Sequence, residues 1–121
     1  MTVERISAAA IKRILRGEVK KPISCFIKFY SNNCHYCQSL KKDYHDLADK
    51  NKDALFYAFN IDDYPGIQKA LKFDGVPTIA FVKTEYPVEI EILDDPKKPN
   101  PDFWYYPSDI EKFIERKKSN G

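Results

Sequence analysis

Residues 24–40, SCFIKFYSNNCHYCQSL, join a run typical of a buried strand to the start of a helix. The first seven of these residues are β-prone and apolar on both faces except for Lys28, which is typical of a central strand covered on both sides. A helix is expected from about Cys34 to Asn51, and residues at helical spacing form its inward stripe: Cys37, Leu40, Tyr44, Leu47 and Ala48. Cys34 and Cys37 therefore lie where the strand gives way to the helix.

The rest of the chain alternates between strand and helix patterns. A strand, a helix and a strand in succession form the βαβ unit of a parallel sheet. The strict alternation of VEIEIL at 88–93 indicates a strand with one face in water. Residues 94–107 contain four prolines and are expected to lack regular structure. The expected strands are 2–6, 24–30, 54–61, 78–83 and 88–93, and the expected helices are 7–17, 34–51, 65–71 and a last helix that opens with a capping box at 108–111.

Length and composition indicate one globular α/β domain spanning residues 1–121. The net charge is only +2, with acidic and basic residues mixed along the chain, which argues against a nucleic-acid-binding surface. No segment reaches the ~20 apolar residues of a membrane span, and the opening MTVERISAAA lacks the apolar run of a signal peptide. We therefore expect a cytoplasmic monomer with neither nucleic-acid nor membrane partners.

The position of the two cysteines favours redox chemistry. The first turn of a helix presents unpaired N–H groups and the positive end of the macrodipole, so a thiolate at Cys34 is stabilised and the thiol pKa falls. Cys37 lies one turn further on, on the same side and closer to the core, within reach of the first sulfur. Thiol–disulfide exchange in two steps follows from this arrangement. Cys34 attacks a substrate disulfide, and Cys37 resolves the mixed disulfide.

The sequence resembles the thioredoxin family over nearly its whole length. The order of expected elements, the Cys-x-x-Cys motif after FIKFYSNN, and the GVPT motif at 75–78 carry the resemblance, and Pro77 lies 40 residues after Cys37. The resemblance implies the thioredoxin fold, a central mixed sheet of about five strands flanked by about four helices. It also implies that Pro77 is cis and sits against the cysteines, and that Val76, Pro77 and Thr78 contact substrate, with the Val76 backbone pairing with the substrate chain.

The residues around the motif depart from the usual thioredoxin pattern. The dipeptide His35-Tyr36 is neither the Gly-Pro of thioredoxins nor the Pro-Tyr of glutaredoxins, although Tyr36 matches the second half of the latter. Asn33 stands where thioredoxins usually have Trp, while the aromatic residue four positions before the first cysteine is retained as Tyr30. These residues, together with Lys28, are expected to modulate the site. We expect His35 to make the reduction potential less negative.

Lys28 replaces the buried acid that thioredoxins carry six residues before the first cysteine. Two interpretations are open. The stem of Lys28 packs along the helix while its charge reaches water, which is the favoured interpretation because burying an unpaired charge is costly. Alternatively, the ammonium lies near Cys37, favours its thiolate and stabilises the dithiol form.

The expected activity is that of a thiol–disulfide oxidoreductase of the protein-disulfide reductase type, with no cofactor. Its expected partners are protein disulfides as substrates and a thioredoxin reductase or another thiol donor, with glutathione as one alternative. A glutaredoxin-like, glutathione-dependent activity is less favoured because the last helix starts with Pro107-Ser108-Asp109 and lacks the Gly-Gly-Asp-like turn of that family. A zinc site is not expected, since Cys25, His35 and His45 add no four-ligand spacing to the cysteine pair.

A protein-docking module without turnover is the alternative from a different class. The run Phe103-Trp104-Tyr105-Tyr106 motivates it, because exposed aromatic residues form partner surfaces. The favoured interpretation is that these rings close the core under a long loop. Cys25, which lies within the apolar strand, is expected to pack and not to react.

Overall fold

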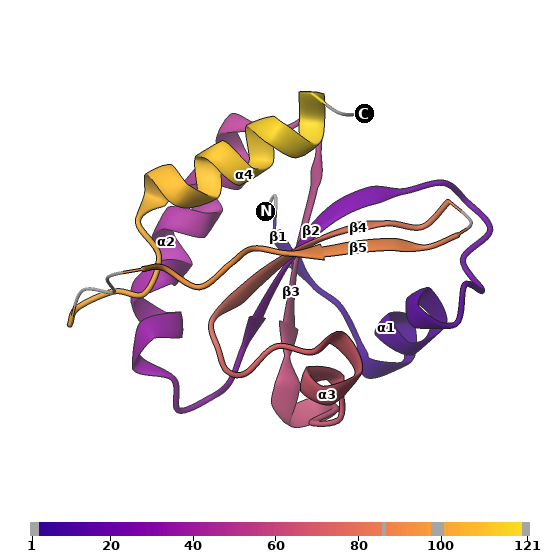
Figure 1. Ribbon diagram of the computed structural model, residues 1–121, viewed down its shortest axis with the longest axis horizontal. Coiled ribbons are helices and arrows are strands. Elements are labelled where there is room, and N and C mark those ends of the chain that lie inside the picture. The colour runs from indigo at the N-terminus through magenta and orange to yellow at the C-terminus, as the bar shows by residue number, and fades with distance from the viewer. Residues whose placement is uncertain (1–2, 86, 98–100, 120–121) are drawn as a thin grey trace.

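The protein is built around a five-stranded mixed sheet with the strand order β1-β3-β2-β4-β5 (Figure 1). The computed structural model describes residues 3–85, 87–97 and 101–119. Strands β1, β3 and β2 are parallel, whereas β4 is antiparallel to β2 and β5 is antiparallel to β4. The strands are β1 Val3–Arg5, β2 Ser24–Tyr30, β3 Leu55–Asn60, β4 Thr78–Lys83 and β5 Glu89–Ile92.

Four α-helices cover the two faces of the sheet. They are α1 Ala8–Leu15, α2 His35–Lys50, α3 Ile67–Leu71 and α4 Pro107–Ser119. Figure 1 shows α2 and α4 on one face and α1 and α3 on the other. Because β2 lies in the middle of the sheet and is covered on both sides, the predicted central strand and the α/β architecture are confirmed.

Alternate residues of β2 belong to two separate hydrophobic clusters, one on each face of the sheet, because successive side chains of a strand point to opposite faces. Phe26 points towards α2 and α4, and its ring centroid lies 5.2 Å from those of Phe56 and Phe81 and 5.9 Å from that of Phe113. Ile27, the next residue, belongs to the cluster under α1 and α3. The buried α2 residues Leu40, Tyr44, Leu47 and Ala48 belong to the same cluster as Phe26, which fixes α2 against the sheet.

The periodic patterns predicted the buried faces of both long helices. All five residues of the predicted α2 stripe are buried, and in α4 the residues at helical spacing, Ile110, Phe113 and Ile114, are buried as well. The predicted alternation in β5 is also confirmed, because Val88, Ile90 and Ile92 pack against the cluster beneath α1 and α3.

The predicted start of α4 is wrong by two residues. The helix begins at Pro107 and not after a cap at Ser108. Asp109 Oδ2 accepts a hydrogen bond of 3.4 Å from the N–H of Tyr106, so the reciprocal contact of the cap involves Tyr106. Proline fits the first helical position because its missing N–H would have no partner inside the helix.

The turn after β3 contains a short 3₁₀ helix, η1 Ile61–Asp63, that the sequence patterns did not predict. The side chain of Asn60 caps it by accepting the N–H of Asp62 at 2.9 Å. The predicted proline-rich irregular segment 94–107 contains neither helix nor strand in its described part before Pro107, and residues 98–100 lie outside the described residues.

Candidate active site

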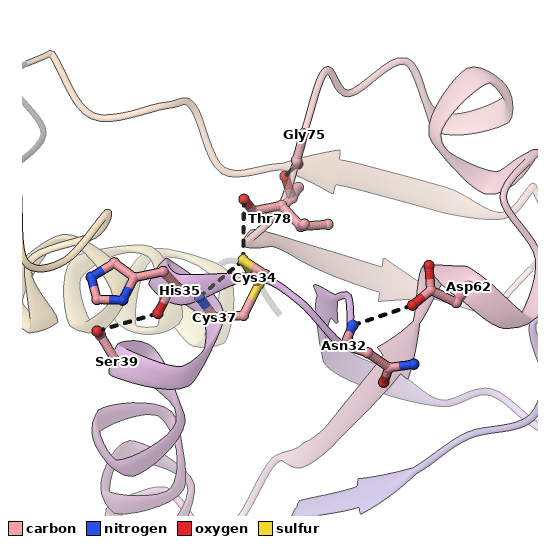
Figure 2. Close-up of a disulfide and its surroundings, with 9 residues drawn as sticks. Asn32, Cys34, His35, Cys37, Ser39, Asp62, Gly75 and Thr78 are labelled. Carbon is pink, nitrogen blue, oxygen red and sulfur yellow. Dashed lines mark hydrogen bonds between the residues drawn. A yellow bond between two sulfur atoms is a disulfide. The ribbon is translucent and has the colours of Figure 1, made fainter.

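Cys34 and Cys37 form a disulfide at the start of α2 (Figure 2). Cys34 is the N-cap of the helix, with extended backbone angles, and the N–H of Cys37 donates a 3.0 Å hydrogen bond to the Cys34 Sγ. A sulfur atom thus occupies the capping position that a serine or aspartate oxygen fills in most helices. The helix terminus directs an N–H group at this sulfur, which is the arrangement that stabilises negative charge there.

The two sulfurs differ in their exposure. Cys37 is 4% exposed, whereas Cys34 is only partly buried. Cys34 is therefore the outer member of the pair, and Cys37 is the inner one. This is the placement that the sequence predicted for an attacking and a resolving cysteine.

The loop before β4 lies against the outer sulfur. The Val76–Pro77 peptide bond is cis, and the carbonyl oxygen of Val76 lies 3.6 Å from the Cys34 Sγ. Thr78 is buried, and its hydroxyl donates a 2.6 Å hydrogen bond to the carbonyl oxygen of Gly75. Figure 2 shows Gly75 and Thr78 next to the disulfide. The structure therefore brings the predicted substrate-contact segment 76–78 to Cys34.

A polar network supports the turn that carries the cysteines. The N–H of Asn32 donates to Asp62 Oδ2 at 3.2 Å (Figure 2), and the Asn60 amide donates to Asn32 Oδ1 at 2.8 Å. Sequence reasoning missed these three supporting residues. The signal available was Asn60 in the sequence NIDD, since asparagine after a strand favours a local turn.

The residues between and before the cysteines lie at the surface. His35 and Asn33 are exposed, and Tyr36 is partly buried. The Tyr36 ring lies 5.6 Å from the His35 ring and 5.5 Å from the Trp104 ring, between centroids. Trp104 is 67 residues after Cys37 in the sequence and was not predicted to be near the site.

The aromatic run 103–106 divides between core and surface. Tyr105 is 1% exposed and belongs to the core, as predicted for the whole run, but Tyr106 is 41% exposed, so the prediction is wrong for that residue. Phe103 and Trp104 are partly buried. Phe103 packs edge-on against Tyr106 with centroids 4.9 Å apart, and this pair forms an aromatic surface at the start of α4.

Lys28 is buried, with 4% of its surface exposed. Its Nζ lies 5.2 Å from the ring centroid of Tyr44 and 5.6 Å from that of Tyr30, in cation–π geometry. The stem of Lys28 is therefore buried, as the favoured interpretation has it, and the ammonium lies against two aromatic rings on the wall of a cavity. Burial, followed by repulsion from Lys41, lowers the pKa of Lys28 to about 8.

Lys28 and Cys37 line the same cavity, which has a volume of about 400 Å³. Tyr30 also lines it, so the three residues predicted on β2 and α2 meet there. An ammonium in this position favours negative charge nearby, including a thiolate at Cys37.

The third cysteine lies apart from the site. Cys25 is 1% exposed in β2, and burial raises the pKa of its thiol to about 12. The prediction that Cys25 packs in the core is confirmed. Within residues 3–85, 87–97 and 101–119, no group of three or more His, Cys, Asp and Glu side chains is arranged to hold a metal ion. None of the described helices combines the length and hydropathy needed to cross a membrane.

Solved structures of thioredoxins share this fold. The Trichomonas vaginalis thioredoxin is 23% identical with a TM-score of 0.68, over 95% of this chain and 96% of that one. The chloroplastic thioredoxin z is 15% identical with a TM-score of 0.68, over 98% and 96% of the two chains. The Schistosoma mansoni thioredoxin is 15% identical with a TM-score of 0.68, over 96% and 98%.

No curated protein sequence matches the chain. The sequence model of the family described as Thioredoxin does match it, over residues 9–98. That segment contains Cys34, Cys37 and Pro77 together with strands β2, β3, β4 and β5 and helices α2 and α3. The chain belongs to the thioredoxin family.

Proposed function

We propose that the protein is a thiol–disulfide oxidoreductase that reduces or exchanges disulfides in protein substrates through the Cys34–Cys37 pair. The observation that carries this proposal is the disulfide at the N-terminus of α2, whose outer sulfur receives the N–H of Cys37 at 3.0 Å. A buried structural disulfide needs neither a partly exposed sulfur nor a helix terminus directed at it.

In the reducing direction, the Cys34 thiolate attacks one sulfur of a substrate disulfide. A mixed disulfide forms, and the other substrate sulfur leaves as a thiolate that takes up a proton. The Cys37 thiolate then attacks Cys34 Sγ, which releases the second substrate thiolate and forms the Cys34–Cys37 disulfide. The substrate gains two electrons, and the protein loses two.

Two features of the site suit these steps. The Cys37 N–H and the helix terminus stabilise the Cys34 thiolate before attack. The Val76 carbonyl, 3.6 Å from Cys34 Sγ, is placed to accept a backbone N–H of a substrate chain docked beside the sulfur. Val76, Pro77 and Thr78 are therefore the proposed substrate contacts.

We further propose that a thioredoxin reductase or another dithiol donor restores the dithiol form, in the cytoplasm and with the protein acting as a monomer. Glutathione is the weaker candidate, because α4 begins at Pro107 with no glycine pair at its start. Comparing turnover with glutathione and with a dithiol reductant separates the two donors.

The test is reduction of a protein disulfide such as that of insulin, with dithiothreitol as the electron donor. The wild-type protein should accelerate the reaction, and Cys34→Ser should abolish the acceleration. Cys37→Ser should accumulate mixed disulfides that are visible on non-reducing gels, because the resolving thiol is missing. Cys25→Ser is the matched control and should remain active. A wild-type protein with no more activity than Cys34→Ser would contradict the proposal.

A docking role without turnover is the second candidate, and the aromatic surface of Phe103 and Tyr106 supports it. The double variant Cys34→Ser/Cys37→Ser separates the two functions. A docking module keeps its partners in this variant, whereas an oxidoreductase loses covalent capture.

A further inference from the structure

The cavity beside Cys37 carries an unusual charge pattern. Its walls come from β1, β2, β3 and α2, and four of the lining residues are basic: Arg5, Lys28, Lys41 and His45. No aspartate or glutamate belongs to the lining. Ser31, Asn32 and Gln38 also line the cavity, and their neutral side chains offer hydrogen-bond donors.

Lys28 is the buried cation of this cavity. Lys28 is 4% exposed. Within the described parts of the chain, no carboxylate lies at ion-pair distance from its ammonium. The rings of Tyr30 and Tyr44 contact the ammonium, but a ring face does not accept its three N–H groups as an anionic oxygen does. No carboxylate of the cavity lining balances the ammonium, so it is available to an anion that enters the cavity.

The pKa shifts of the basic residues reflect the positive charge in the cavity. Repulsion from Lys41 adds to burial in lowering the pKa of Lys28. Burial lowers the pKa of His45, and Lys28 and Lys41 lower it further, against a weaker opposite effect of Asp49 and Asp46. Arg5 is the exception, because it pairs with Asp63 at 3.3 Å on the partly exposed rim. The excess positive charge therefore lies between β2 and α2.

We propose that this cavity is a binding site for a small phosphate-bearing molecule, with the phosphate held between Lys28 and Lys41. A dianionic phosphate matches two lysine charges, and the neutral donors of Asn32 and Gln38 suit its remaining oxygens. The volume of about 400 Å³ falls within the range of small-molecule sites and exceeds what a phosphate alone needs. The site adjoins Cys37 and shares Lys28 with the surroundings of the cysteine pair, but phosphate binding there is a property beyond the proposed exchange reaction.

The test uses the oxidised wild-type protein, titrated with inorganic phosphate, pyrophosphate and citrate at an ionic strength held constant with sodium chloride. Calorimetry gives the affinity, and amide shifts in ¹H–¹⁵N spectra locate the site. We expect saturable binding of pyrophosphate, with the largest shifts at Lys28, Gln38 and Lys41. Citrate separates phosphate recognition from a general preference for anions.

The variants Lys28→Met and Lys41→Gln should each weaken pyrophosphate binding about tenfold or more, since each removes a charge-assisted contact. Lys42→Gln is the matched control, because Lys42 is the neighbouring lysine but pairs with Asp46 on the exposed side of α2. If Lys28→Met does not fold, as judged by circular dichroism, the affinities of Lys41→Gln and Lys42→Gln for pyrophosphate are sufficient to test the proposal.

Three results would overturn the proposal. The first is the absence of saturable binding of any of the three anions to the wild type. The second is equal affinity in the wild type, Lys41→Gln and Lys42→Gln. The third is tighter binding of citrate than of pyrophosphate, which would refute the assignment to phosphate.

Discussion

Cys25 and Cys34 lie nine residues apart in the sequence, but their surroundings differ in each property that controls thiol reactivity. Cys25 is paired within the sheet between Leu55 of β3 and Val82 of β4, and it is 1% exposed. Cys34 caps α2, is partly exposed and receives an N–H group. Residue type is the same in both places, so position in the fold decides which cysteine reacts.

The cysteines also face different cavities. The cavity next to Cys25 has a volume of about 220 Å³ and is lined mainly by apolar side chains, such as Ile6, Ile14 and Ile23. The cavity next to Cys37 contains Lys28 and Lys41. An apolar wall disfavours a thiolate, whereas nearby cations favour one. The sheet therefore separates an inert sulfur from a pair that is suited to exchange.

The largest expected difference is in the rate of alkylation. A thiol whose pKa is about 12 is a thiolate at pH 7 in only ~10⁻⁵ of molecules, whereas an ordinary accessible thiol is ionised at the per cent level. In the reduced protein, iodoacetamide should modify Cys34 at least a thousandfold faster than Cys25, roughly following these fractions. Peptide mass spectrometry over time measures both rates.

The pH dependence sharpens this test. The Cys25 rate should rise about tenfold per pH unit up to pH 10, because its thiolate fraction grows throughout that range. The Cys34 rate should level off once that thiol is ionised. Comparable rates at the two cysteines at pH 7 would refute the assignment of Cys25 as inert.

The second expected effect concerns Lys28 and the stability of the oxidised protein. The folded pKa of about 8 lies below the unfolded value of ~10.4, so the charged form destabilises the fold below pH 8. This cost decreases as the pH rises from 8 towards 10.4, since the folded protein then releases a proton that the unfolded chain retains. Lys28→Met should raise the free energy of unfolding at pH 7 by on the order of 2 kcal/mol.

Urea denaturation at pH 7 and pH 10 provides the measurement. The stability gain of Lys28→Met should shrink between these two values, and a gain that is independent of pH would argue against a shifted Lys28 pKa. Lys42→Gln serves as the control, since Lys42 is exposed and paired with Asp46, and it should show no comparable pH-dependent difference from the wild type.

Lys28 shows where sequence reasoning reached its limit. The helical period of α2 placed Tyr44 on the buried face, and the strand pattern placed Lys28 in the central strand. Neither pattern shows that the ammonium lies over the Tyr44 ring, because that contact depends on the angle at which α2 crosses the sheet. The two aromatic rings around the ammonium, Tyr30 and Tyr44, were therefore not predicted.

The same limit applies to contacts between distant segments. The cysteine pair and the GVPT segment were predicted to meet because a family resemblance linked them. Trp104 has no such signal, and it reaches Tyr36 through a loop without regular structure. The prediction of where α4 starts was wrong for a local reason. Ser108 and Pro107 both satisfy common rules for a helix start, and the helix begins at the proline.

A third, smaller effect is expected on the reduction potential of the cysteine pair. A positive charge near a thiolate stabilises the dithiol form and makes the potential less negative; His35 lies inside the motif, and Lys28 lines the cavity next to Cys37. His35→Gly and Lys28→Met should each shift the potential to more negative values by roughly 10–30 mV. Equilibration with a glutathione buffer gives the potential. The thiolate absorbance of the Cys34→Ser variant gives the pKa of Cys37, and this pKa should be higher in the double variant Cys34→Ser/Lys28→Met. An unchanged potential would remove the substituted residue from the tuning of the site.

The smallest effect should come from Cys25→Ala, which tests whether the buried cysteine is inert in exchange. Cys25 packs in the cluster under α1 and α3, so removing its sulfur leaves a small void next to the existing cavity. We expect a loss of about 1 kcal/mol in the free energy of unfolding, at the low end for truncation of a buried side chain. The potential of the Cys34–Cys37 couple and the rate of insulin reduction should not change, because Cys25 contributes neither a thiolate nor a charge near the pair. A shift of the potential in Cys25→Ala, or a mixed disulfide captured at Cys25 in Cys37→Ser, would show that the buried sulfur takes part in exchange and that the separation between the two regions is incomplete.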